Sequence, residues 1–272
     1  QNLKNRATGS AALAGGIANA AGGSFTLAFW GSGNTANTAY STVINGKKNS
    51  VLGSSGVGNG LSTIITGSGN TLTGDFSLIS HGIGNTIDGS QHSTIIGGYQ
   101  NIINGNSTLM AIIGGSGNTI NGSGGFSGKH SVIVGGYFNY IGGATSIGAV
   151  VIGGNTNSAL GEYSVVLGGI GNTARAMGSV AMGGGAEATQ TFTFSIGGTN
   201  TTTSSPINNT ISLHGVTGVG MAEGGFFTGP ADIAEMFQYL DGNPTNEDRR
   251  GLFVSITSGG TVKVGNENII GI

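Results

Sequence analysis

Side chains that could perform acid–base, nucleophilic or metal chemistry are few and scattered along this chain. There is no cysteine, which excludes thiolate zinc sites, cysteine nucleophiles and disulfides. The histidines lack the spacing of metal ligands; they are His81, His92, His130 and His214. Glycan hydrolysis would need a carboxylate pair, and the acids available in the first 200 residues are Asp75, Asp88, Glu162 and Glu187. We therefore predict no catalytic site, no metal and no cofactor in that region.

Glycine dominates the composition: 57 of the 272 residues are glycine, 3 are proline and 7% are charged. Because pairs of Val, Ile and Leu interrupt the glycines, this composition favours a folded repeat over a disordered linker. The net charge of -2 and the lack of a long basic cluster argue against nucleic acid or membrane partners. No apolar run could span a bilayer and no signal peptide is apparent, so we expect any export signal or virion anchor to lie outside this chain.

One phrase recurs through the first 200 residues: a small residue, β-formers, one or two glycines, two variable positions, Asn and an apolar residue. Residues 93–105 (STIIGGYQNIING) are one copy. A unit of about 15 residues holds two short strands and two turns, which predicts an all-β, parallel β-roll or β-solenoid of about twelve coils. The glycines that anchor the copies are Gly16, Gly31, Gly46, Gly67, Gly82, Gly98, Gly115, Gly136, Gly154, Gly169, Gly184 and Gly198.

The Asn of each copy follows the anchor glycine by three residues. Asn tolerates left-handed turns, and glycine supplies positive φ without a Cβ clash. Stacked at the same corner of successive coils, these side chains can also hydrogen-bond to one another as a ladder. The residues concerned are Asn19, Asn34, Asn49, Asn70, Asn85, Asn101, Asn118, Asn139, Asn157 and Asn172.

Adjacent apolar pairs in the repeats predict an assembly. Neighbouring residues of a strand point to opposite faces, so both faces of that sheet need burial. One face fills the coil, and no amphipathic helix in the first 200 residues could cover the other, which leaves a second copy of the chain as the cover. The pairs are Val51/Leu52, Ile64/Ile65, Ile95/Ile96, Ile112/Ile113, Val151/Ile152 and Val166/Leu167.

Longer coils mark places where a ligand could bind. Insertions fall at residues 53–61, 104–110, 121–130 and 143–149, and insertions in solenoids lie in surface loops. Phe126, Lys129 and His130 form one candidate contact patch in such a loop. The alternative is that the loop is a tolerated bulge without a ligand.

The repeat itself resembles a known family. Residues 164–169 (SVVLGG) and 178–183 (GSVAMG) are similar to the head repeat of YadA-type trimeric autotransporter adhesins, over roughly residues 7 to 200. This resemblance implies a left-handed parallel β-roll in a homotrimer that binds host surfaces or matrix. The repeat also occurs in phage tail fibres, so it specifies shape better than ligand.

The character of the chain changes after residue 200. The phrase stops, a polar stretch follows at 201–206, and the last 72 residues hold as many charged side chains as the first 200. We expect a repeat domain at 1–200, a transition segment at 201–230 and a separate domain at 231–272. The pattern predicts one short helix at 231–239, then a strand at 251–256 with a hairpin partner at 261–264.

This last segment carries a second resemblance. Residues 231–237 (ADIAEMF), 241–244 (DGNP) and 247–254 (EDRRGLFV) resemble the start of the self-cleaving intramolecular chaperone of phage pre-neck appendage proteins, the G2 peptidase family. It implies autoproteolysis by carboxylates, with Asp232 and Glu235 as acid and base candidates. The alternative is that both are solvated or structural. That family's domain is longer, so we expect the chain to stop inside it.

Together these features predict a structural and adhesive homotrimeric fibre, located on a virion surface or an extracellular appendage. The C-terminal resemblance favours a phage or virus tail fibre over a bacterial surface adhesin. The expected partners are two further copies of the chain, a host receptor such as a glycan, and other virion or appendage proteins at the N-terminal end. A tailspike-type glycan depolymerase is the alternative from another class.

Overall fold

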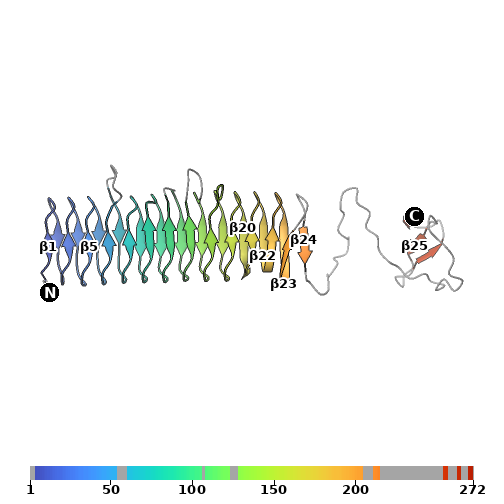
Figure 1. Cartoon of the computed structure of the whole chain (residues 1–272), viewed down its shortest axis with the longest axis horizontal. Coiled ribbons are helices and arrows are strands. Elements are labelled where there is room, and N and C mark those ends of the chain that lie inside the picture. The colour runs from blue at the N-terminus through green and yellow to red at the C-terminus, as the bar shows by residue number, and fades with distance from the viewer. Residues whose placement is uncertain are drawn as a thin grey trace. The chain divides into compact units, whose positions relative to one another are not determined.

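The computed structural model describes residues 4–53, 60–105, 108–122, 128–204, 211–214, 254–256, 262–264 and 269–271. The chain divides into two units, Gln1–Gly218 and Val219–Ile272. The first unit is a parallel β-solenoid of about 12 turns with coils of about 15 residues. Its strands lie side by side along the axis of the solenoid from β1 to β24 (Figure 1). The predicted repeat architecture is confirmed.

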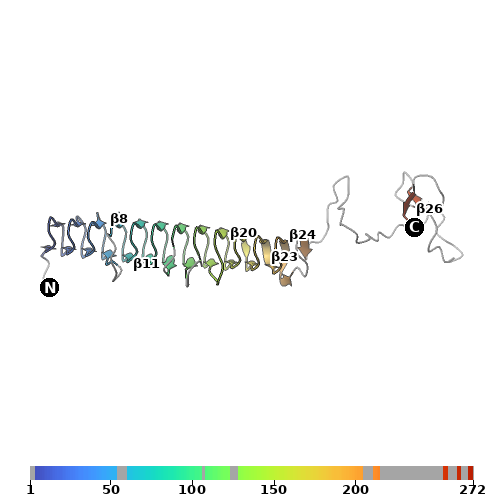
Figure 2. The ribbon, with the colours of Figure 1, turned by 90° about the horizontal axis from the view of Figure 1, so that it is seen from above.

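Each coil contributes one strand to each of two sheets, which form opposite walls of the roll (Figure 2). Each strand from β1 to β20 pairs in parallel with the strand two places further along the chain, as Ile95 with Ile112 and Ile112 with Ile133. Sheet 1 comprises β2 (Leu13–Ala14), β4 (Leu27–Ala28), β6 (Thr42–Val43), β8 (Thr63–Ile64), β10 (Leu78–Ser80), β12 (Thr94–Ile96), β14 (Ala111–Ile113), β16 (Val132–Val134), β18 (Val150–Ile152) and β20 (Val165–Ile170). Sheet 2 comprises β1 (Arg6–Ala7), β3 (Ala20–Ala21), β5 (Thr35–Ala36), β7 (Ser50–Val51), β9 (Thr71–Leu72), β11 (Thr86–Asp88), β13 (Ile102–Asn104), β15 (Thr119–Asn121), β17 (Tyr140–Ile141), β19 (Ser158–Ala159) and β21 (Thr173–Ala174).

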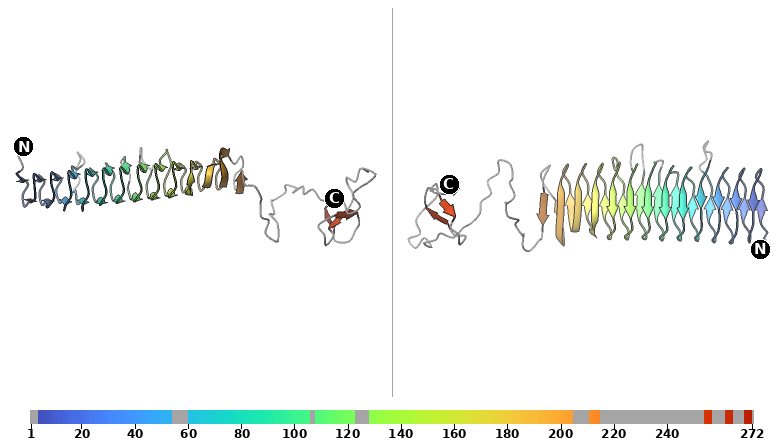
Figure 3. Two further views of the ribbon diagram at one scale, coloured as in Figure 1. Left: turned by 90° about the horizontal axis from the view of Figure 1, so that it is seen from below. Right: turned by 180° about the vertical axis from the view of Figure 1, so that it is seen from behind.

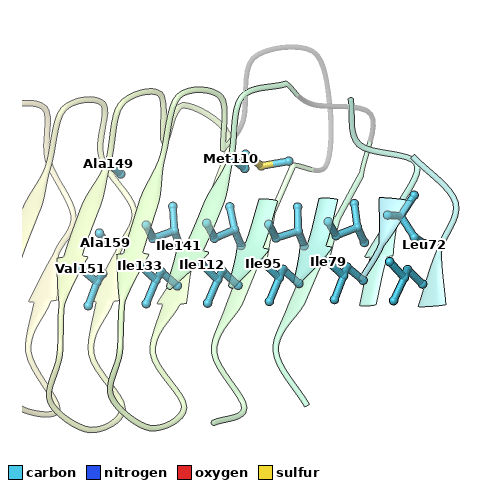
Figure 4. Packing of buried hydrophobic residues seen from close by; sticks show 14 of the residues in the cluster. Leu72, Ile79, Ile95, Met110, Ile112, Ile133, Ile141, Ala149, Val151 and Ala159 are labelled. Carbon is cyan, nitrogen blue, oxygen red and sulfur yellow. The ribbon is translucent and has the colours of Figure 1, made fainter. Parts of the chain in front are cut away.

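The core is one side chain deep on each wall. Most strands bury a single residue completely, such as Ile95 and Ile112 from sheet 1 and Ile103 from sheet 2. These side chains form two facing rows along the roll (Figure 4). Isoleucine and leucine fill the middle coils, whereas alanine occupies the same positions near both ends, as at Ala36 and Ala174.

The corner that leads from sheet 1 to sheet 2, here called the Asn corner, is a continuous hydrogen-bonded ladder. The backbone N–H of each buried Asn donates to the Oδ1 of the Asn one coil earlier, at 2.9 Å for Asn34 to Asn19 and 3.1 Å for Asn118 to Asn101. Each Nδ2 donates to a glycine carbonyl, as from Asn101 to Gly115 at 3.1 Å. The ladder was predicted to join side chains to one another, but its rungs run from backbone N–H to side-chain Oδ1, and direct side-chain bonds occur in the described part of the chain from Asn70 to Asn49 and from Asn172 to Asn157, each at 3.1 Å. It begins one coil earlier than expected, because Asn5 Oδ1 accepts from Asn19 N–H at 3.0 Å.

Removing one member of the ladder should be costly. Asn101→Ala deletes the acceptor of the buried Asn118 N–H, and one orphaned buried group costs about 1–3 kcal/mol. We therefore expect the free energy of unfolding, measured by urea titration, to fall by about 2–3 kcal/mol. Asn155→Ala is the matched control, because Asn155 is exposed on the same corner; equal losses in the two variants would contradict a structural role for the ladder.

In the first coil the Asn corner is one residue shorter, because Asn19 follows Ala14 by five positions; from Ala28 to Asn172 all changes in coil length fall at the opposite corner. The ladder Asn follows the buried residue of sheet 1 by six positions in coil after coil, as in Ala28 to Asn34 and Val166 to Asn172. The path from sheet 2 back to sheet 1 instead ranges from seven residues (Ala36 to Val43) to thirteen (Val51 to Ile64). A longer Asn corner would break two rungs of a buried ladder, so the insertions predicted from sequence have one tolerated place.

The pattern changes at the C-terminal end of the solenoid. Strand β22 (Val180–Ala188) pairs with β20 and then with β21, so one strand crosses both walls. Ile170 pairs with Gly184, one residue earlier than the repeat predicts, and Ala186 takes the place of the next ladder Asn, donating to Asn172 Oδ1 at 2.9 Å. Strands β23 (Phe194–Ser204) and β24 (Ile211–His214) continue the sheet, as the view from behind also shows (Figure 3).

The second unit is described through three strands. Strand β25 (Val254–Ile256) pairs antiparallel with β26 (Val262–Val264), which confirms the predicted hairpin, and with β27 (Ile269–Gly271), which was not predicted. The helix expected at 231–239 lies outside the described residues, and the described ranges contain no helix. Within those ranges no helix is long and apolar enough to cross a membrane.

Candidate functional site

The outward face of sheet 1 is apolar and uncharged. In each strand the residues before and after the buried one point outward. One outward row contains Leu13, Leu27, Thr42, Thr63, Leu78, Thr94, Ala111, Val132, Val150 and Val165, and the other contains Phe29, Ile44, Ile65, Ser80, Ile96, Ile113, Val134, Ile152 and Leu167. In the second row Ile96 and Ile152 are each 48% exposed. A single chain therefore presents a long apolar stripe to water.

The outward face of sheet 2 has the opposite character. Its outward residues are mostly Thr, Ser and Asn, with Asp88 in β11 and Arg6 in β1. Of the apolar pairs found in the sequence, Val51/Leu52 belongs to this sheet, whereas the other five belong to sheet 1. The assumption that all six pairs share one sheet was therefore wrong. The exposed apolar surface is therefore concentrated on sheet 1.

The corner that leads from sheet 2 to sheet 1 carries a second exposed row, here called the aromatic corner. Except at Leu61, its backbone is left-handed, with φ of 55° at Phe25 and 53° at Tyr163. Neighbouring coils are hydrogen-bonded here, as Tyr163 N–H to the Ile147 carbonyl at 2.7 Å. Left-handed geometry costs a non-glycine residue roughly 1–2 kcal/mol. The row consists of Phe25, Tyr40, Leu61, Phe76, His92, Leu109, His130, Tyr163 and Phe192.

Rings of this corner stack on one another along the solenoid. Phe25 and Tyr40 have centroids 5.2 Å apart, and Phe76 and His92 5.0 Å apart, both with planes 3° from parallel. Such offset stacks stabilise by about 0.5–1.5 kcal/mol each. Tyr163 is nevertheless 59% exposed. The rings are ordered by the coils and remain available for an external contact.

Two residues of the predicted contact patch lie at this corner. His130 belongs to the aromatic corner, and its N–H donates to the Thr108 carbonyl at 3.2 Å. Lys129 precedes it, and its carbonyl accepts from Gly148 N–H at 2.7 Å. Phe126 lies outside the described residues. The structure thus places Lys129 and His130 together, where an insertion of the chain returns to the solenoid.

The acids of the repeats are not brought together. Asp75 is buried, and the exposed Asp88 accepts a hydrogen bond from Thr73 Oγ1 at 2.7 Å. Glu187 pairs with Arg175 at 3.1 Å on the surface. Within the described ranges, no hydrogen bond joins two of these carboxyl groups and no cluster of His, Asp and Glu could hold a metal ion.

The acid and base candidates Asp232 and Glu235 lie outside the described residues. The comparisons with known proteins add no family: the chain matches no protein-family model and no curated protein. The candidate functional surfaces of the described chain are the apolar face of sheet 1 and the aromatic corner beside it.

Sequence reasoning missed the aromatic corner, although a signal for it exists. An aromatic residue or His stands three positions before the buried residue of sheet 1 in several coils, as Phe25 before Ala28, Phe76 before Ile79 and Tyr163 before Val166. The same position lies six residues before the anchor glycine of its coil, as Phe76 before Gly82, so an alignment on the glycines contains the signal; Gly148 and Gly178 interrupt it.

Proposed function

We propose that this chain is one protomer of a homotrimeric structural and adhesive fibre, exposed on a virion surface or an extracellular appendage. The observation that carries the proposal is the outward face of sheet 1, which is apolar, uncharged and unpartnered in a single chain. Contiguous exposed apolar surface of this extent is typical of protein–protein interfaces. The described chain offers no competing catalytic constellation.

A ring of parallel chains fits this face better than a pair. Parallel solenoids packed around a common axis present sheet 1 inward at every level and close without leaving a free apolar edge. The polar sheet 2 then faces water, in agreement with its Thr, Ser and Asn side chains. The number three comes from the resemblance of the repeats to trimeric adhesin heads, and a phage or virus origin from the resemblance at 231–254.

The native mass tests the assembly. For a chain of 26.7 kDa, sedimentation equilibrium should give a particle of about 80 kDa, three times the chain mass, down to micromolar concentration. A stable monomer there would contradict the proposal, since its apolar face would then be soluble without a partner.

Adhesion is tested at the insertion next to the aromatic corner. We expect Lys129→Ala to weaken binding of the purified protein to host cells on the order of tenfold, because few interface residues supply most of the affinity. Lys47→Ala is the charge-matched control, since Lys47 is exposed at the Asn corner. Equal binding by the parent protein and both variants would remove Lys129 from the receptor contact.

A further inference from the structure

Five consecutive coils place a glycine at the end of their sheet 1 strand, before the Asn corner. These positions are left-handed, with φ between 62° and 71°. A Cβ built on the first four would meet nothing within 4 Å, and on the fifth only the Ile152 carbonyl at 3.5 Å. This glycine row consists of Gly97, Gly114, Gly135, Gly153 and Gly168.

The single chain does not require glycine at these positions. Earlier coils carry Trp30 and His81 at the equivalent place, with φ of 59° and 68°. At the aromatic corner of the same strands, bulky residues also adopt left-handed geometry, such as Tyr163 with φ of 53°. Neither the backbone conformation nor the local space excludes a side chain. Glycine here leaves the backbone open to close approach from outside.

The surroundings of the glycine row match a protein contact. On one side lies the exposed apolar row of sheet 1, including Ile113 and Ile152, and on the other lie the exposed Tyr99, Tyr137 and Ile170. None of these side chains is charged. The polar Ser116 and Asn155 alternate with the two tyrosines and Ile170, so the glycine row is a strip of bare backbone between an apolar row and a mixed, uncharged row.

The aromatic corner of a second copy has the repeat needed to fill that strip. Coils of both copies advance by the same rise, about 4.8 Å, so the two rows stay in step. In the five coils of the glycine row the aromatic corner carries His92, Leu109, His130, Gly148 and Tyr163, so a bulky side chain stands level with four of the five glycines. The two rows flank the buried residues of sheet 1 on opposite sides, as Tyr163 before β20 (Val165–Ile170) and Gly168 within it. The chains of the proposed ring are related by rotation about an axis that runs parallel to the solenoid, in front of sheet 1. This rotation brings the aromatic corner of one chain onto the glycine row of the next, which is a head-to-tail contact that closes a ring.

The face is large enough for an assembly. About twelve coils at about 4.8 Å each give a face about 58 Å long, and the six residues from Tyr163 to Gly168 span about 16 Å. The resulting area of about 900 Å² per chain is shared between two neighbours in a ring, and it is of the same order as the roughly 800 Å² that each partner buries in a stable pairwise interface.

We propose that in the assembled fibre the aromatic corner of each chain packs on the glycine row of the next chain. This inference rests on the proposed homotrimer and specifies its seam. The insertions enter the chain between sheet 2 and the aromatic corner, on the far side of that corner from the sheet 1 strands that form the seam. His130, a member of the aromatic corner, lies between the seam and one of these insertions.

A disulfide tests the seam, because the chain contains no cysteine of its own. Within one chain, positions 163 and 168 are about 16 Å apart along an extended strand, too far for a disulfide. The double variant Tyr163→Cys with Gly168→Cys should give covalent trimers on mild oxidation, and each single variant should stay uncrosslinked. Covalent dimers from a single variant would show a symmetric contact and overturn the seam. A trimeric mass without crosslinks would contradict the seam but not the proposed homotrimer. A monomeric mass would contradict both proposals.

A bulky substitution gives an independent readout. Gly135→Phe should weaken association at least on the order of tenfold, measured by sedimentation, because the ring fills the space that the neighbouring chain needs. Gly171→Phe is the matched control: its φ of 67° and its empty surroundings are the same, but it lies one residue before Asn172 on the side of sheet 2. Equal association of the two variants would contradict the seam.

Discussion

Replacing Ile113 by lysine is expected to convert the proposed trimer to a monomer. Ile113 is 44% exposed in the single chain and lies at the centre of the face that the proposed trimer buries. An unpaired charge in such an interface costs about 3 kcal/mol or more, which weakens association on the order of a hundredfold. Around a threefold axis the three ammonium groups would also repel one another.

The control for this variant is an isoleucine on the other wall. Ile102 is 37% exposed and points outward from sheet 2, which the proposed trimer leaves in water. Ile102→Lys should keep the trimeric mass in sedimentation, whereas Ile113→Lys should lose it. Dissociation of both variants, or of the Ile102 variant alone, would place the interface elsewhere.

Truncation of a core residue in the middle of the solenoid should produce the largest loss of stability. Ile112 is completely buried between Ile95 and Ile133 of the neighbouring coils. The Ile112→Ala variant buries less apolar surface and contains a cavity, which together should lower the free energy of unfolding by about 2–5 kcal/mol. Because each coil contacts only its neighbours, the loss also weakens the coupling between the two halves of the solenoid. Urea unfolding monitored by circular dichroism measures it.

The same exposed residue provides the comparison. Ile102→Ala removes the same atoms from a partly exposed site, so its cost should stay below about 1 kcal/mol. If the two alanine variants unfolded at the same urea concentration, the row through Ile112 would not be the core of the roll.

Much of the solenoid could be predicted because its rules are local and repeated. Gly16 to Gly169 define coils whose following residues pair in register, from Ile17 with Ser32 to Asn155 with Ile170. The prediction fails where the corner itself changes: at Gly184 the pairing shifts by one residue because β22 crosses both walls without the Asn turn. A spacing rule contains no information about such a merger of two strands.

The surfaces were harder to predict than the coils. Alternation identifies Leu52 and Ile113 as outward residues, but sequence does not say on which wall each lies, and they belong to different sheets. The aromatic corner depends on left-handed geometry at residues such as Phe76, which bulky side chains seldom adopt. It is specified by the stacking of neighbouring coils and not by the preference of any one residue.

The unequal corners have a consequence for how such a protein can change. From Ala28 to Asn172 the Asn corner keeps one length, whereas the other corner accepts extra chain between Gly53 and Gly60 or between Gly122 and Gly128 without disturbing a rung. New receptor-binding sequences can therefore be inserted at this corner without any change in the rest of the solenoid. In the proposed trimer each inserted segment occurs three times at the same level along the axis. A segment that binds a receptor weakly therefore gains avidity from this arrangement alone.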